Sequence, residues 1–219
     1  MSPPVPVLMY HHVVGGDPGP GDPFTVGADE LDEHLAALVA AGRRLRPVGA
    51  LLDDPSPHDV YLTFDDAFTS FAELVVPLLD AHGAGATVFV PTAWMGSAAD
   101  WAESGDAAGL HVLSASQVAA LPPALVEVGG HGHRHTPLDL LDAATLADEL
   151  RTSRSMLTEV LGRAPRSIAY PFGYHTAAVR AAAAAAGWSL GCEVGYALHR
   201  RGGDPLAVRR LLVGPGTTG

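Results

Sequence analysis

The segment VYLTFDD (residues 60–66) joins a short, mainly apolar run to two adjacent aspartates, Asp65 and Asp66. Short apolar runs are typical of strands that are covered on both faces, as in parallel sheets. The two carboxylates follow where the run ends, and in α/β folds the active site gathers at the carboxyl ends of the strands. This segment therefore predicts a buried parallel strand with chemically active side chains at its end.

Comparable runs occur at residues 5–10, 86–90, 126–128, 167–170, 189–194 and 207–213. Apolar residues at helical spacing lie between them, at residues 31–41, 74–79, 146–161 and 177–186, and a glycine soon follows each stretch. Asp142 or Thr145 is the predicted N-cap of the third helix. About seven strands that alternate with helices predict an α/β fold with a parallel sheet or barrel, and periodicity alone leaves open which.

The composition is that of an ordinary globular chain. Of the 219 residues, 47% are hydrophobic and 17% are charged, which predicts one domain over residues 1–219. The formal net charge of -11 argues against a nucleic-acid partner. The single cysteine, Cys192, excludes an internal disulfide, and no apolar run reaches the ~20 residues of a membrane span. The N-terminus lacks the features of a secretory signal, so the chain as given is expected to be cytoplasmic.

Three of the eleven histidines lie in HGHRH (residues 131–135), directly after a predicted strand. Histidines spaced i and i+4 can converge on one ion from a helical turn, with His133 pointing away. Together with one of the two aspartates, His131 and His135 predict a site for one divalent metal, zinc by preference. The alternatives are a solvated loop for the histidines and a helix N-cap for the aspartates, and they leave the clustering at strand ends unexplained.

Two histidines and one carboxylate leave coordination positions open for water and substrate, as in a catalytic site. Metal-assisted hydrolysis follows, because the metal activates a water and the second aspartate is free to take its proton. The same ligand set holds iron in oxygenases, but the adjacent second aspartate favours hydrolysis.

Two further strand ends carry candidate groups. His11 and His12 follow the first predicted strand, and a histidine there could protonate a leaving group. Phe172 follows another strand, in PFGY (residues 171–174), where backbone N–H groups could stabilise an oxyanion. An ordinary histidine-containing loop and a simple turn are the alternatives at these positions.

Taken in order, these segments resemble the polysaccharide deacetylases of carbohydrate esterase family 4. VPVLMYHHV (residues 5–13) is similar to the opening strand of one bacterial branch, and LTFDD (residues 62–66) to the first motif of the family. EVGGHGHRH (residues 127–135) resembles the second motif, and AYPFG (residues 169–173) the third. The likeness extends over nearly the whole chain.

The resemblance implies a distorted (β/α) barrel of about seven strands. It also implies a hydrolase that removes N-acetyl groups from an amino sugar or an N-acetylglucosamine-containing polysaccharide. By this analogy Asp65 is the general base, and the N–H of Phe172 helps to form the oxyanion hole. The metal, zinc with cobalt or nickel as alternatives, is held by Asp66, His131 and His135.

The branch that opens with Tyr-His resembles a circularly permuted form of the family, which makes His11 the general acid. Carbohydrate is then the expected partner, while the oligomeric state stays open. Related enzymes of this family are often secreted or associated with the cell wall. The resemblance therefore leaves the location open, although the chain as given is expected to be cytoplasmic.

The sequence departs from the family pattern at three positions. Ala67 replaces a glycine beside the base, and Gly132 replaces a serine or threonine after the first histidine ligand. Ala169 replaces an arginine that orients the base, and Arg209 or Arg210 could substitute for it. These departures keep two rivals open, a carbohydrate-binding protein with a degenerate site and an O-acetyl esterase. Residues 92–111 form a long insert, which is expected to act as a lid or a binding wall.

Overall fold

The structure is a computed structural model that describes residues 4–19, 22–53, 55–99, 101 and 109–217. Its main sheet is parallel throughout, and seven of its strands follow one another across it. In sheet order these are β10 (Leu211–Leu212), β1 (Val7–Tyr10), β5 (Asp59–Phe64), β6 (Ala86–Val90), β7 (Val126–Gly130), β8 (Ser167–Ala169) and β9 (Leu190–Cys192). An eighth strand, β4 (Arg44–Pro47), pairs with the first part of β5.

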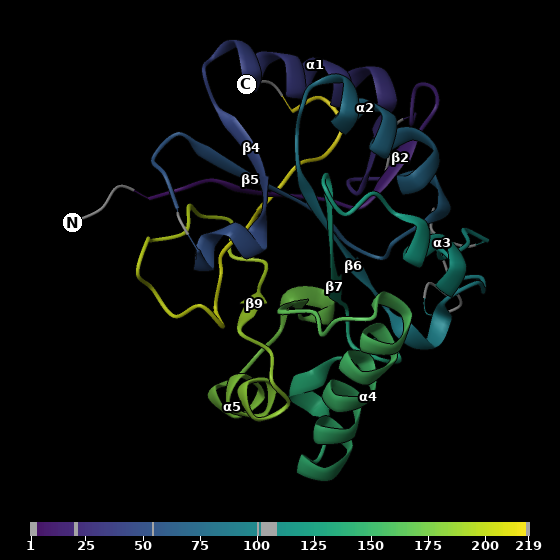
Figure 1. Ribbon diagram of the computed structural model, residues 1–219, viewed down its shortest axis with the longest axis vertical. Helices are drawn as coiled ribbons and strands as arrows, with labels where there is room; N and C mark the ends of the chain where they lie inside the picture. Colours follow the sequence, from purple (N-terminus) through teal and green to yellow (C-terminus); the bar gives the residue numbers. More distant parts are fainter. Residues whose placement is uncertain (1–3, 20–21, 54, 100, 102–108, 218–219) are drawn as a thin grey trace.

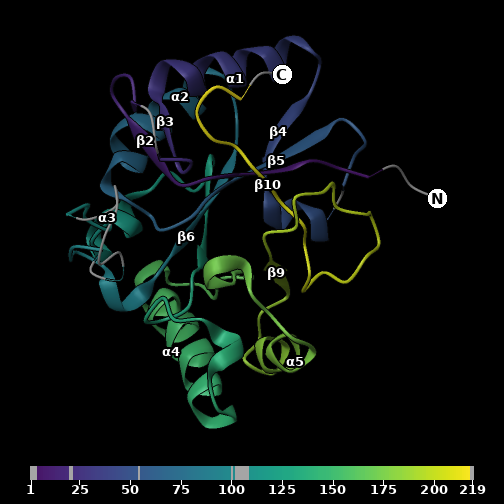
Figure 2. The ribbon, with the colours of Figure 1, turned by 180° about the vertical axis from the view of Figure 1, so that it is seen from behind.

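The sheet curls into a distorted barrel, as the sequence resemblance implied. A parallel bridge joins Cys192 at the end of β9 to Val208, shortly before β10, so the two ends of the strand order approach each other. The helices lie around the outside of the sheet (Figures 1 and 2). They are α1 (Ala28–Ala40), α2 (Val76–Ala81), α3 (Ala115–Ala120), α4 (Ala143–Leu161) and α5 (Ala177–Ala185).

Local sequence explains where the longest helix begins and ends. Of the two predicted caps for α4, Asp142 is the one observed, because its side chain accepts hydrogen bonds from the N–H groups of Ala144 and Thr145. The helix stops at Gly162, whose φ of 66° is the left-handed conformation that favours glycine. No helix in the described part of the chain has the length and apolar character to cross a membrane.

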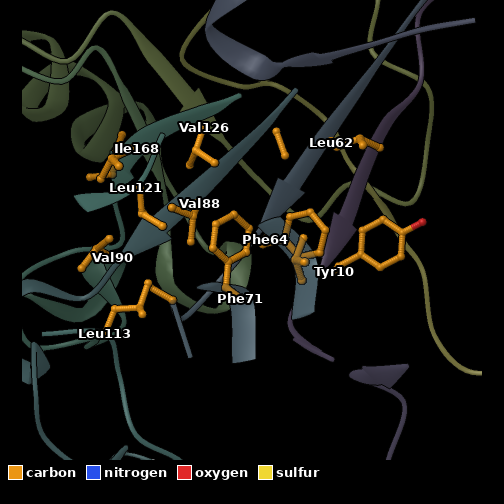
Figure 3. Close-up of a cluster of buried hydrophobic side chains, with 14 of the residues drawn as sticks. Tyr10, Leu62, Phe64, Phe71, Val88, Val90, Leu113, Leu121, Val126 and Ile168 are labelled. Atoms are coloured by element: carbon orange, nitrogen blue, oxygen red, sulfur yellow. The ribbon is translucent and has the colours of Figure 1, made fainter. Parts of the chain in front are cut away.

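Residues that alternate along β5, and likewise along β6, enter two separate hydrophobic clusters. On β5, Tyr61 belongs to the cluster inside the barrel, whereas Leu62 and Phe64 belong to the cluster between sheet and helices. The outer cluster contains stacked Tyr10 and Phe64 rings, 5.1 Å apart between centroids, and is shown in Figure 3. Because side chains alternate along a strand, Asp65 at the end of β5 points inward, like Tyr61.

Several elements were not predicted from the sequence. These are β4, α3, and a small parallel sheet formed by β2 (His12–Val14) and β3 (Thr25–Gly27). The predicted strand at residues 207–213 is also shorter than expected, since only β10 and the bridge at Val208 form. The β2–β3 pair matters for the site, because it holds the segment after His11 beside Phe24.

Candidate active site

The predicted site residues come together at the carboxyl ends of four strands. His11 follows β1, Asp65 and Asp66 follow β5, His131 follows β7, and Phe172 lies in the turn after β8. All of them, together with His135, line one cavity of about 650 Å³. In a parallel barrel this edge is the one where side chains from several strands can meet.

Asp66, His131 and His135 form a compact group of three buried side chains that could hold a metal ion. Their ligand atoms all lie within 4.8 Å of one another. Oδ1 of Asp66 is 3.2 Å from Nε2 of His135 and 3.5 Å from Nε2 of His131. Donor atoms bound to one tetrahedral zinc at ~2.0–2.1 Å are separated by ~3.4 Å, so this spacing fits a shared ion.

The hydrogen bonding of His131 supports the same conclusion. Its Nδ1 lies 2.9 Å from the carbonyl oxygen of Ala169, which places the proton on Nδ1 and a lone pair on Nε2. Burial lowers the pKa of His131 to about 4, so the imidazole is neutral near pH 7. A lone pair that faces a carboxylate is repelled unless a cation lies between them, and Oδ1 of Asp66 has no hydrogen-bond partner among the described residues. The three residues therefore fit a divalent metal ion.

The histidine segment is not the helical turn that the i, i+4 spacing suggested. Residues 131–137 form an irregular loop, because Gly132 and His135 both take left-handed conformations, with φ of 69° and 58°. The buried Glu149 on α4 holds this loop by accepting hydrogen bonds from the backbone N–H groups of His133 and Arg134. The prediction that His133 stands apart agrees with its bond to Thr92 Oγ1 at 3.0 Å.

Asp65 is paired with a fully buried arginine. The Nη1 and Nη2 atoms of Arg210 donate to the two carboxylate oxygens of Asp65 at 2.6 and 2.8 Å. Burial alone would raise the pKa of Asp65, but the charge and the hydrogen bonds of Arg210 hold this pKa below its ordinary value. Of the two arginines considered from sequence, Arg210 is therefore the one that orients Asp65. The exposed Arg209 pairs with Glu193 instead.

His11 lines the same cavity as Asp66, His131 and His135 and lies close to Asp65. Its Nε2 is 3.9 Å from Oδ2 of Asp65, and its ring packs edge-on against Phe24 with 4.8 Å between centroids. The neighbouring His12 also lines the cavity, but its Nδ1 faces Thr25 Oγ1 at 3.3 Å. The pKa of His12 is lowered by burial. Geometry thus favours His11 over His12 as the histidine next to Asp65.

Phe172 lies in the turn after β8 and packs its ring against His135, with 4.9 Å between centroids. Its φ of 61° is uncommon for a residue with a side chain. All the described non-glycine residues with positive φ lie at or next to this cavity: Asp66, Ala67, His135, Phe172 and Tyr196. Such strained conformations gather at functional sites, where the surrounding packing enforces them.

Two of the three departures from the family pattern have structural explanations, whereas the third, Ala67, is in a strained conformation. Ala67 takes a φ of 51°, where glycine would be less strained, and is held by a bond from the N–H of Leu113 to its carbonyl oxygen. Gly132 occupies a left-handed position that disfavours serine or threonine. Ala169 lies in the inner hydrophobic cluster, and its missing arginine is replaced by Arg210.

Sequence reasoning missed two parts of the site. Glu149 was passed over, although a glutamate between Leu146 and Leu150 on the apolar face of a helix is itself a signal of a buried polar role. The exposed rim residues Phe24, Tyr174 and Tyr196 were also missed. The predicted wall at residues 92–111 is represented by Trp101 and Leu110, which line the cavity; residues 100 and 102–108 lie outside the described residues.

Comparison with known proteins places this site in a family. YxkH of Bacillus subtilis (strain 168), whose name refers to polysaccharide deacetylases, is 24% identical over 221 residues, covering 98% of this chain and 73% of YxkH. A chitin deacetylase of Pestalotiopsis sp is 27% identical over 127 residues, which is 58% of this chain but only 38% of that protein.

Solved structures share the fold. The deacetylase PplD of Streptococcus pyogenes, in complex with acetate, has a TM-score of 0.85 at 23% identity, with 100% of this chain and 96% of that chain covered. A de-N-acetylase of Aggregatibacter actinomycetemcomitans has a TM-score of 0.83 at 19% identity, with 98% and 97% covered. The family model for polysaccharide deacetylase matches residues 53–191, which include the aspartate pair, His131, His135 and Phe172. The chain therefore belongs to the polysaccharide deacetylase family.

Proposed function

We propose that this protein is a metal-dependent hydrolase that removes N-acetyl groups from an amino sugar or an N-acetylglucosamine-containing polysaccharide. The observation that carries the proposal is the pairing of two chemically distinct aspartates. Asp66 faces the Nε2 atoms of His131 and His135, whereas the adjacent Asp65 is held by Arg210 and lines the same cavity. One carboxylate is thus free to act as a base beside a metal site.

The ligands of the ion are Asp66, His131 and His135. A divalent ion held there, zinc by preference with cobalt or nickel as alternatives, would lower the pKa of a water and polarise the acetyl carbonyl. Asp65 takes the proton of the attacking water, and Oδ2 is the oxygen nearest to the ligands, 3.9 Å from Nε2 of His131. Arg210 keeps Asp65 ionised and fixes the direction of its carboxylate.

His11 donates a proton to the departing nitrogen. Its Nε2 lies 3.9 Å from Oδ2 of Asp65, which supports this role, because an acid and a base from different strands could then act on one reacting group. The backbone N–H of Phe172, held beside His135 by the contact between the two rings, stabilises the negative charge that develops on the acetyl oxygen. A deacetylase of the same fold has been solved in complex with acetate, which would be the product of such a reaction.

Acetate release from a panel of acetylated sugars, with and without a chelator, tests the proposal. The panel contains N-acetylglucosamine oligomers, peptidoglycan fragments and O-acetylated xylan, and elemental analysis accompanies it. We expect release from N-acetylated substrates that stops with chelator and returns with zinc. Release from O-acetylated substrates alone would make the protein an esterase, and tight sugar binding without release would make it a binding protein.

Two variants test the assigned roles. Asp65→Asn and His11→Ala should each lower kcat by about 10²–10⁴-fold, the range typical of lost acid–base catalysis, while the bound metal per chain stays unchanged. His12→Ala is the matched control for His11→Ala, because it removes the neighbouring imidazole from the same cavity. Full activity of either Asp65→Asn or His11→Ala would refute the corresponding role.

A further inference from the structure

The aromatic side chains with the largest exposed fractions all line the same cavity. These are Phe24 (46%), Phe172 (49%), Tyr174 (60%) and Tyr196 (72%). By contrast, the exposed large aliphatic residues Val39, Leu140 and Leu198 are not among the residues that line it. Exposed apolar surface that gathers at a cavity marks a binding site, whereas scattered exposed residues need no explanation.

Tyr174 and Tyr196 come from two loops that are fixed against each other. Gly173 lies so close to Val194 that an added Cβ would be 2.5 Å from Cγ2 and 2.7 Å from the backbone nitrogen of Val194. His175 Nε2 is also hydrogen-bonded to the carboxylate of Glu193, and Arg180 contacts its Nδ1 at 2.9 Å. The two tyrosines therefore flank a rigid contact between the loop after β8 and the loop after β9.

The cavity offers more room than an acetyl group requires. Its volume of about 650 Å³ falls within the ~300–1,000 Å³ of pockets that enclose ligands of several rings. Tyrosine suits the flat, apolar face of a sugar ring and its surrounding hydroxyl groups, because the side chain combines a large apolar body with a polar tip. A lipid would instead favour the aliphatic side chains, which are exposed elsewhere.

We propose that Tyr174 and Tyr196 form a stacking wall for sugar rings that adjoin the residue being deacetylated, so that the substrate is a glycan chain and not a monosaccharide. This inference rests on the proposed deacetylase function of the same cavity. The wall lies on the side of the Phe172 turn, because Tyr174 follows Phe172 by two residues. It therefore orients the glycan on the side where the acetyl oxygen is to be held.

Chain-length dependence tests the wall. For the unsubstituted protein, kcat/KM should rise with the length of N-acetylglucosamine oligomers. Tyr174→Ala and Tyr196→Ala should each lower kcat/KM for long oligomers by about 2–10-fold, mainly through KM, which corresponds to the ~0.5–1.5 kcal/mol of one aromatic contact. Tyr174→Phe and Tyr196→Phe keep the ring and should retain most of the activity. Hydrolysis of p-nitrophenyl acetate, which has no sugar rings, should be unchanged in all variants.

Binding without catalysis separates this inference from the proposed function. Calorimetric titration of the chelated protein with a long N-acetylglucosamine oligomer should show weaker binding in the double variant Tyr174→Ala/Tyr196→Ala, and unchanged binding in the exposed control Leu140→Ala. If no substrate releases acetate but this difference in binding is found, the wall stands and the deacetylase proposal fails. If the double variant binds and cleaves long oligomers like the unsubstituted protein, the wall is refuted.

Discussion

At the scale of single residues, the pair of Asp65 and Arg210 links stability to chemistry. Both side chains are buried, and the guanidinium of Arg210 is the group that compensates the charge of the carboxylate. Removing one partner of such a pair leaves an uncompensated buried charge, which costs about 3–5 kcal/mol. We expect Arg210→Met to lower the free energy of unfolding by this amount and to lower kcat, because Asp65 loses its orientation.

Arg209→Met is the matched control for this prediction. Arg209 is the adjacent residue, but it is exposed and its nearest acidic partner, Glu193, lies at 3.4 Å. Its replacement should change the free energy of unfolding by less than about 0.5–1 kcal/mol. Urea denaturation of both variants measures the difference, and equal stabilities would contradict the assignment of Arg210.

The proposed metal ligands, Asp66, His131 and His135, give a second prediction at this scale. A ligand that binds only the folded chain stabilises it, by about 2.7 kcal/mol at one hundred times its Kd. Added zinc should therefore raise Tm of the unsubstituted protein, and the rise should disappear in His131→Ala and His135→Ala. His133→Ala is the control within the same loop and should keep the rise, because this residue bonds to Thr92 instead. A rise that survives in His135→Ala would exclude it as a ligand.

A site residue could be predicted from the sequence where the pattern that marks it lies within a few neighbouring residues. The aspartate pair and the two histidines are local patterns at strand ends, so they could be identified before the structure was known. The choice between Arg209 and Arg210 was not local, because it depends on which side chain points into the barrel. The left-handed conformations at Gly132 and His135 could not be anticipated either, since they follow from the way Glu149 and the loop pack together.

At the scale of elements, the glycines that end β7 show how the histidine loop is placed. An added Cβ on Gly130 would lie 2.6 Å from Cη2 of Trp188 and 2.8 Å from Oγ of Ser153. Gly130→Ala should therefore lower the free energy of unfolding by about 1–3 kcal/mol, the cost typical of overpacking. It should also weaken zinc binding, because the next residue is His131.

Gly15→Ala provides the comparison for Gly130→Ala. Gly15 lies in a loop with nothing within 4 Å of an added Cβ, so its replacement should leave stability nearly unchanged. Chemical denaturation and zinc titration of both variants measure the two effects. Unchanged stability and zinc affinity in Gly130→Ala would show that the end of β7 can shift without disturbing the ligands.

Elements were predictable where one hydrophobic pattern continued over several residues. The strand at β5 and the helix α4, with its cap at Asp142 and its end at Gly162, agree closely with expectation. Strands β2 and β3 have three residues each, and β4 has four residues of which two are arginines. Such short strands form because they pair with strands that are distant in the sequence. They are too short to show a hydrophobic periodicity from which they could be predicted.

At the scale of the whole molecule, the strand that His11 follows lies within the sheet although it is first in sequence. β1 pairs with β5 on one side and with the last strand, β10, on the other. The proposed acid thus enters the site from the N-terminal strand, next to the segment that supplies Arg210. The circular permutation that the resemblance implied remains a prediction.

The two hydrophobic clusters should contribute differently to activity. Phe89 lies in the inner cluster, and the guanidinium of Arg210 is 5.6 Å from the centre of its ring. Leu157 on α4 is equally buried but belongs to the outer cluster. Phe89→Ala should cost about 3–5 kcal/mol and Leu157→Ala about 2–5 kcal/mol of stability, because both leave a cavity.

Only the change at Phe89 should also impair the site. Without this ring, the guanidinium of Arg210 loses the contact with Phe89 that helps to hold it in place. We therefore expect Phe89→Ala to lower kcat at least about 10-fold. This is measured well below the unfolding temperature, where the variant is folded. Leu157→Ala should keep kcat within about twofold under the same conditions, because surface helices can repack without moving the strand ends.

The milder variant Phe89→Leu replaces Phe89→Ala in this experiment if the alanine variant does not fold, and it should also lower kcat. Equal kcat values for the inner and outer variants would mean that the position of Arg210 does not depend on the barrel interior. In that case its bond to the carbonyl oxygen of Glu193 would be the contact that fixes it.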